Sequence, residues 1–280
     1  MKKLNTLLFS TVPFLLAMVV QVVAVYYLLI IAAIFLFGVA PAVQGTTYTV
    51  DDLLNLSSDM TFNTLASIFF SVFCIALFAI WYYRSFGGNI KINVKKSFHP
   101  YEILGIALLV PGAQFMCSIA MSMISLIFPS WLEDYMELIE SVGLTGDIPL
   151  LMMIYSVLLA PIGEELIFRG VTLRIARRAF PFWIANIIQA LLFGIFHMNP
   201  LQGCYTFLVG LFMGYVCEKG GTLYHAILFH LLFNLWGTTV SEWLVVDDVA
   251  LQGLIIIAGT VFGLVGGIFL LKKGSHAKTH

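Results

Sequence analysis

Long apolar segments alternate with short polar breaks along the chain, and this pattern predicts membrane-spanning helices. A spanning helix needs about 20 mostly apolar residues. Eight segments approach or exceed that length: residues 10–40, 61–83, 101–128, 148–179, 182–198, 201–217, 221–241 and 250–271. The first is too long for the apolar part of a signal peptide and has no small-residue cleavage site before Pro41, so we expect an uncleaved helix. The fold class predicted is all-α, a polytopic membrane protein with about eight transmembrane helices.

The charges between these segments predict the orientation, because cytoplasmic loops collect Lys and Arg. Basic residues precede the first segment and follow the second, fourth, sixth and eighth, whereas the alternate loops hold only acidic charges. We therefore expect a multi-pass protein of the cell membrane with both termini in the cytoplasm. Asp52, Asp134 and Asp247 should lie outside, and residues 131–140 should form a short helix on the outer surface.

The amino-acid composition supports a membrane protein and argues against several other classes of protein. Hydrophobic residues make up 60% of the 280 and charged residues only 10%, whereas roughly a quarter of the residues in a soluble domain are charged. The net charge of -1 and the few basic residues argue against nucleic acid as a partner. The four cysteines have no CxxC spacing, so neither a disulfide framework nor a thiolate metal site is expected. Without a Pro- or Ser-rich linker or a repeat, residues 1–280 should form a single integral membrane domain.

Ionisable side chains inside the spans are the candidates for chemistry, because an unpaired charge in hydrocarbon costs several kcal/mol. They fall on the fourth, fifth and seventh segments, with weaker polar candidates elsewhere. The principal ones are Glu164, Glu165, Arg169, His197, His230 and Asn234; His225, Gln114, Asn186 and Gln189 are weaker.

Depth predicts that these groups meet. If the fourth and fifth segments turn near Phe180 and Pro181, Glu164 and His197 lie about equally far from the turn and face each other. A rise of 1.5 Å per residue places Glu164 about 15 Å and His230 about 14 Å from the cytoplasmic boundary, near the middle of a core about 30 Å thick. The sequence therefore predicts one site at mid-membrane.

Spacing within the helices leaves alternatives open. Glu165 and Arg169 are four residues apart and should pair, either as a structural ion pair or as part of the chemistry. His197 taken alone would be a helix-to-helix hydrogen-bonding group more often than a catalyst. Glu164 has no cation four residues away, which favours a functional role. Since there is no HExxH, intramembrane Asp pair or Ser elbow, what remains is a carboxylate base with imidazole and amide partners.

Three strings in order, EExxxR (Glu164, Glu165, Arg169), FxxxH (Phe193, His197) and HxxxN (His230, Asn234), resemble the CPBP family of CAAX-processing and bacteriocin-processing intramembrane proteases, also called the Abi family. The resemblance covers about residues 148–236, which would form the catalytic core. It implies that Glu164 and His197 activate water, that His230 and Asn234 form an oxyanion hole, and that Glu165 and Arg169 orient and charge-balance the site. Members of this family are described both as metalloproteases and as metal-independent glutamate proteases.

The resulting hypothesis is an intramembrane endopeptidase that cleaves a membrane-associated or lipid-modified, CAAX-like or bacteriocin-like substrate, with Glu164 activating water and no cofactor. One alternative is a zinc-dependent version, since two His and one Glu (Glu164, His197, His230) are a common zinc set. Another is a non-catalytic bacteriocin-immunity or scaffold protein. Transport ranks last, because no symmetric pair of broken helices is evident.

Overall fold

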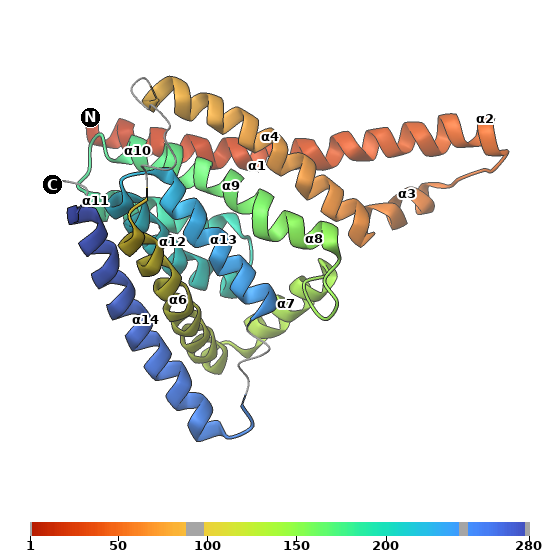
Figure 1. Ribbon diagram of the computed structural model, residues 1–280. Coiled ribbons are helices and arrows are strands. Elements are labelled where there is room, and N and C mark those ends of the chain that lie inside the picture. Colours follow the sequence, from red (N-terminus) through yellow and green to blue (C-terminus); the bar gives the residue numbers. More distant parts are fainter. Residues whose placement is uncertain (1, 88–97, 241–245, 278–280) are drawn as a thin grey trace.

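The computed structural model describes residues 2–87, 98–240 and 246–277, and every regular element in these ranges is a helix (Figure 1). The all-α class is therefore confirmed. The elements outside the candidate site are α1 (Lys2–Ile34), η1 (Phe35–Val39), α2 (Ala40–Gln44), α3 (Val50–Ser57), α4 (Met60–Phe86), α6 (Pro100–Ile127), α7 (Pro129–Ser141) and α14 (Val249–Ala277).

Six of the described helical segments are long and apolar enough to cross a membrane: Lys2–Gln44, Met60–Phe86, Pro100–Ile127, Leu150–Ala176, Pro200–Gly220 and Val249–Ala277. The other two predicted spans are also helical but shorter. They are α11 (Phe182–Phe196), with 15 residues, and α13 (Leu223–Thr239), with 17. The chain is thus a multi-pass membrane protein, and all eight apolar segments of the sequence form helices.

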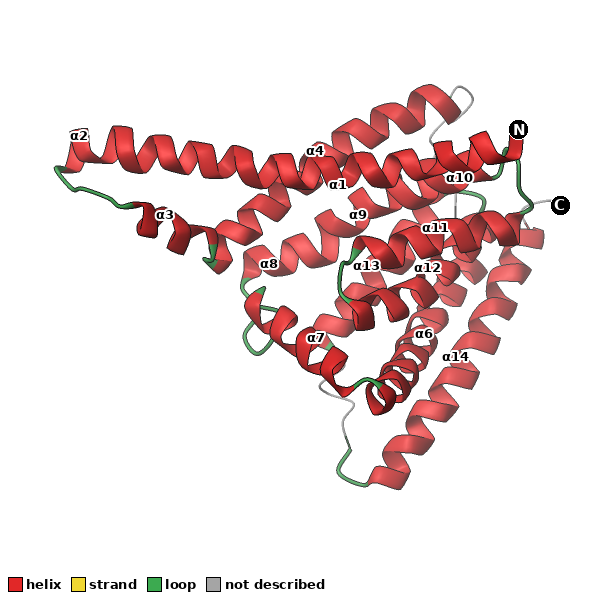
Figure 2. Cartoon of the chain, turned by 180° about the vertical axis from the view of Figure 1, so that it is seen from behind, coloured by secondary structure: helices red, strands yellow, loops and turns green. Residues whose placement is uncertain are grey.

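The helices form a bundle with two outer pairs around a central group. In Figure 1, α1 and α4 lie along one side, α6 and α14 along the other, and α8 to α13 between them. This central group includes α8 (Leu150–Ile154), α9 (Ala160–Glu165), α10 (Leu173–Ala176) and α12 (Pro200–Gly220). The far end of α1 projects from the bundle with α2 and α3, a shape that Figure 2 shows from behind. The apolar side chains of this projection, among them Ile34, Phe35 and Val43, are exposed. Such a surface is expected where lipid is the surrounding solvent.

Small residues bring α6 and α14 into direct backbone contact. A Cβ added to Gly263 would lie 2.6 Å from the Cα of Gly112, and one added to Gly105 would lie 2.7 Å from the backbone nitrogen of Leu271. Lipid provides no hydrophobic drive for helix association, so close approach and dispersion stabilise such a pair. The α6 and α14 pair in turn supports α12 and α13, which carry part of the candidate site.

The two ends of the bundle differ in charge. The beginning of α1, the end of α14 and the arginines of α10 (Leu173–Ala176) and the turn after it lie at one end, and α7 lies near the other (Figure 1). The predicted surface helix over residues 131–140 is present as α7. Its Glu133, Asp134 and Glu137 are exposed. The beginning of α1, the end of α14 and the basic turn after α10 thus lie together, as the charge pattern predicts, and the side of the membrane that they face stays a prediction.

Cysteine labelling tests that orientation. Asp134→Cys should react with a membrane-impermeant maleimide on intact cells, because acidic loops stay outside. Lys272→Cys, at the end of α14, should react only after permeabilisation. Both positions are exposed in the structure, and the unsubstituted chain serves as the background for its own four cysteines. Labelling of position 134 only after permeabilisation would reverse the orientation.

Candidate active site

A single interrupted helix, Leu150–Ala176, carries the two glutamates and the arginine. Two wider π-helical turns interrupt it, closed by hydrogen bonds from the Ala160 N–H to the Tyr155 carbonyl and from the Leu173 N–H to the Phe168 carbonyl. Pro161 has no N–H to donate to the preceding turn, and the first wide turn accommodates it. Such turns are rare and often occur at functional sites. The segments are α8 (Leu150–Ile154), η2 (Tyr155–Leu159), α9 (Ala160–Glu165), η3 (Leu166–Thr172) and α10.

The predicted Glu165–Arg169 pair is present and fully buried. A guanidinium N–H of Arg169 donates to Glu165 Oε1 at 2.8 Å, and another donates to the carbonyl of Gly210 at 3.3 Å. The Phe193 ring lies 4.4 Å from the guanidinium carbon, a cation–π contact. Neither side chain of the pair is exposed. The arginine therefore joins η3 to α11 and to α12 (Pro200–Gly220).

His230 of α13 lies between the two glutamates. Its Nδ1 is 2.8 Å from Glu165 Oε1, and its Nε2 is 3.7 Å from Glu164 Oε2. Because carboxylate oxygens only accept hydrogen bonds when ionised, Nδ1 carries the proton in the shorter contact. The depth argument had predicted that His230 meets Glu164 at mid-membrane, and the family resemblance had implied that Glu165 helps to orient the site. Neither had predicted this direct contact of Glu165 with the imidazole.

His197 ends α11 and is held by its own helix. Its Nδ1 is 2.9 Å from the Phe193 carbonyl, so Nδ1 carries the proton and Nε2 is the acceptor of the neutral ring. The next residue, Met198, has a positive φ of 56°. Residues other than glycine rarely adopt this conformation, and such strain clusters at active sites. The turn brings the chain directly into α12.

Asn234 lies one helical turn after His230 on α13. Its amide nitrogen donates to the Ser156 carbonyl at 2.8 Å, inside the first π-helical turn. An Asn amide has two N–H groups, so one is used by the backbone and one remains for another acceptor. The widened turn at Ser156 thus decides how the asparagine is held.

One cavity of about 570 Å³ brings the candidates together. Glu164, His197, His230 and Asn234 all line it, whereas Glu165 and Arg169 lie behind its wall. From this inner end the cavity runs to the first turns of α4 and α12 and to α7. Lining residues that the sequence had not singled out include Ser67, Tyr155, Gln202 and Tyr205. Ser and Tyr are ordinary in apolar helices, and only the fold places them here.

The weaker polar candidates have structural partners. Gln189 donates to the Gly210 carbonyl at 2.9 Å and to Asn186 at 2.7 Å, so it shares an acceptor with Arg169. Gln114 lines the cavity and donates to the Phe233 carbonyl at 2.6 Å. His225 lies apart from the site, with its Nε2 3.1 Å from Glu102. These contacts tie α11 to α12 and α6 to α13.

Comparison with known protein families identifies the segment that carries the candidate site. Residues 146–236 match the family model described as type II CAAX prenyl endopeptidase Rce1-like. This segment is similar to that family. The match runs from the loop before α8 into α13 and contains all three motifs, so the resemblance to the CPBP family is confirmed there. It supports an intramembrane endopeptidase in general terms. No curated protein and no solved structure matches the chain.

The arrangement of donors bears on the zinc alternative. Among the residues that the structure describes, no three His, Cys, Asp or Glu side chains are placed to hold a metal ion. Within the proposed set, the Nδ1 of His230 is occupied by Glu165, and the Nδ1 of His197 by a backbone carbonyl. These hydrogen bonds leave the Nε2 atoms of both histidines available, as the outer hydrogen bonds of metal-binding histidines do, so the zinc-dependent version stays an alternative.

Removing the buried arginine should destabilise the protein. Arg169→Ala leaves Glu165 buried without its charge partner, which costs about 3–5 kcal/mol, so the variant should accumulate poorly and lose its thermal transition in detergent. Arg177→Ala is the matched control, because its pair with Glu218 is 38% exposed on both sides and contributes about 1 kcal/mol or less. Equal stability of the two variants would contradict a structural role for the buried pair.

Proposed function

We propose that this protein is an intramembrane endopeptidase in which Glu164 activates the hydrolytic water. The observation that carries the proposal is the contact of Glu164 with His230 on the wall of a cavity inside the bundle, with His197 and Asn234 on the same wall. The Glu164 side chain is 15% exposed and Glu165 is fully buried. Of the two glutamates, only Glu164 is therefore within reach of a water and a substrate.

The proposed reaction is a general-base hydrolysis. Glu164 takes a proton from a water held between it and the free Nε2 of His197, and the water oxygen attacks the scissile carbonyl. The Nε2–H of a protonated His230 and the second N–H of Asn234 donate to the developing oxyanion. Glu164 then delivers its proton to the leaving amine. Glu165 holds the imidazole of His230 through Nδ1, the role that an orienting carboxylate has beside a catalytic histidine.

The direction in which the cavity runs indicates where a substrate would enter. The cavity runs from Glu164 toward α7, where Tyr135, Leu138 and Ile139 lie on its wall. Its lining combines these apolar side chains with a few polar groups, which suits an apolar peptide segment or a lipid-modified one. If the charge pattern sets the orientation, the α7 end of the cavity faces the outer side of the membrane. We therefore favour a membrane-associated substrate that enters from the α7 end.

Substitution of the base tests the proposal. Glu164→Gln and His197→Ala should each lower cleavage by about 100- to 10,000-fold, the usual contribution of general acid–base catalysis, while both variants still accumulate in the membrane. N-terminal peptide profiling of membranes that carry each variant measures the loss across all membrane proteins, so the substrate need not be identified first. Glu137→Gln, an exposed change on α7, is the matched control. Wild-type profiles from Glu164→Gln would favour a non-catalytic immunity or scaffold protein.

Metal analysis tests the choice between the water-activating and zinc-dependent versions. We propose that no cofactor is needed, because an amide is a poor zinc ligand and Asn234 is better explained as a donor to a carbonyl oxygen. The purified protein should contain well under one zinc per chain and should keep its peptidase activity after exhaustive chelation. Stoichiometric zinc, lost together with activity and restored with it, would instead make Glu164, His197 and His230 ligands.

A further inference from the structure

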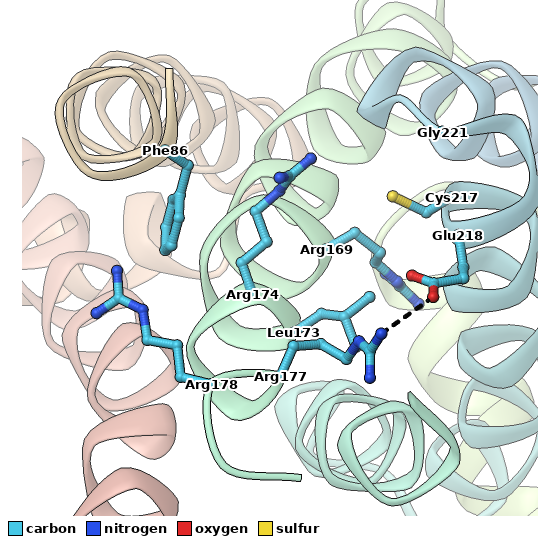
Figure 3. A pocket seen from close by; sticks show the side chains of 9 residues that line it. All are labelled: Phe86, Arg169, Leu173, Arg174, Arg177, Arg178, Cys217, Glu218 and Gly221. Carbon is cyan, nitrogen blue, oxygen red and sulfur yellow. Dashed lines mark hydrogen bonds and ion pairs between the residues drawn. The ribbon is translucent and has the colours of Figure 1, made fainter. Parts of the chain in front are cut away.

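A second cavity lies at the end of the bundle remote from α7. It measures about 410 Å³ and lies between the end of α4, the end of α10 and the end of α12. Figure 3 shows four arginines around it, Arg169, Arg174, Arg177 and Arg178, with Phe86 and Glu218 on opposite sides. We call this cavity the arginine pocket. It is separate from the cavity of the candidate active site, which Arg169 does not line.

The arginine pocket has an excess of positive charge. Arg177 pairs with Glu218 at 3.2 Å, and Arg169 is paired with Glu165, one helical turn before it. Arg174 and Arg178 have no carboxylate partner among the described residues. An arginine keeps its charge at all physiological pH values, so these two residues line the pocket without a counter-ion from the described chain.

Aromatic rings hold the two unpaired arginines in place. The guanidinium carbon of Arg174 lies 5.1 Å from the Tyr82 ring centre, and that of Arg178 lies 5.0 Å from the Phe86 ring centre. Contact through the flat face of a guanidinium leaves its N–H edge free to bind two oxygens of a phosphate at once. These ring contacts restrict the two guanidinium groups before any anion binds.

The buried end of the pocket supplies an independent observation. The Nε of Arg169 is buried and has no hydrogen-bond partner in the structure, although nearly all buried polar atoms have one. Arg169 contributes to the pocket wall and also binds Glu165. An anion in the pocket would thus lie beside an incompletely satisfied cation that is part of the candidate active site.

The tendency of Lys and Arg to lie on the cytoplasmic side does not by itself explain these arginines beside aromatic rings. Basic residues anywhere in the flanking loops would meet it, whereas here Arg174 and Arg178 each contact an aromatic ring of α4, Tyr82 and Phe86 respectively. We propose that the arginine pocket binds the phosphate of an anionic phospholipid headgroup. Basic pockets between membrane helices on the cytoplasmic side bind such headgroups, and the apolar Phe86 and Leu173 on the wall suit the glycerol and upper acyl carbons. A free phosphate has the same recognition chemistry, so the experiment separates the two sources.

Native mass spectrometry of the full chain in detergent, with phosphatidylglycerol and phosphatidylcholine in equal amounts, tests the proposal without a peptidase assay. The wild type should retain phosphatidylglycerol in preference. The double variant Arg174→Gln/Arg178→Gln should weaken its binding by about 30-fold and leave phosphatidylcholine unchanged. Arg174→Lys/Arg178→Lys keeps both charges and should also bind more weakly, because an ammonium cannot form the paired contact; it keeps the test valid if the Gln variant fails to fold.

A control variant tests whether the loss is specific to the arginine pocket, and free phosphate tests whether the ligand is a lipid. Lys272→Gln/Lys273→Gln removes the same charge at the same end of the bundle, on α14, and should bind phosphatidylglycerol as the wild type does. Wild-type affinity in the Gln and Lys variants of the arginine pair, or an equal loss in the α14 control, would overturn the pocket. If inorganic phosphate added in phosphatidylcholine alone binds as tightly as phosphatidylglycerol, the lipid assignment is wrong.

Discussion

Burial of the Arg169 charge is the constraint on which the central part of the structure depends. A guanidinium in the bundle interior is tolerated only when its donors and its face find partners. Here those partners come from three elements: Glu165 on its own helix, the Gly210 carbonyl of α12 and the Phe193 ring of α11. Gln189 binds the same carbonyl and fixes it further. Helices that could otherwise slide in lipid are therefore fixed in register at the level of the site.

The two adjacent glutamates lie in different environments, and the functions proposed for them differ accordingly. Glu165 is enclosed with Arg169 and holds one nitrogen of His230, whereas Glu164 reaches the cavity and the other nitrogen. The π-helical turns on either side of α9 contribute to this division. By adding a residue per turn, they change the face that each following side chain presents. The proposed orienting group and the proposed reacting group thus come from neighbouring positions of one helix.

The two ends of the bundle differ in charge and in the cavity that each holds. At one end the site cavity reaches α7 and its exposed carboxylates, and at the other end the arginine pocket lies against the back of the helix that carries the glutamates. Arg169 is common to both regions, since it binds Glu165 and lines the arginine pocket. A peptide substrate and an anionic lipid would therefore meet the same helix from opposite ends.

The sequence by itself determined the helical class, the apolar segments and the residues able to carry charge into the membrane, because hydropathy and helical spacing are local properties. It also determined the Glu165–Arg169 pair, since residues four apart share a helical face. Only the tertiary structure decided that His230 lies between both glutamates, that Asn234 binds the Ser156 carbonyl, and that Phe86 stacks on Arg178. These contacts join residues far apart in the chain, or depend on π-helical turns that shift the helical phase. A periodic pattern of apolar and polar positions predicts neither these long-range contacts nor the π-helical turns.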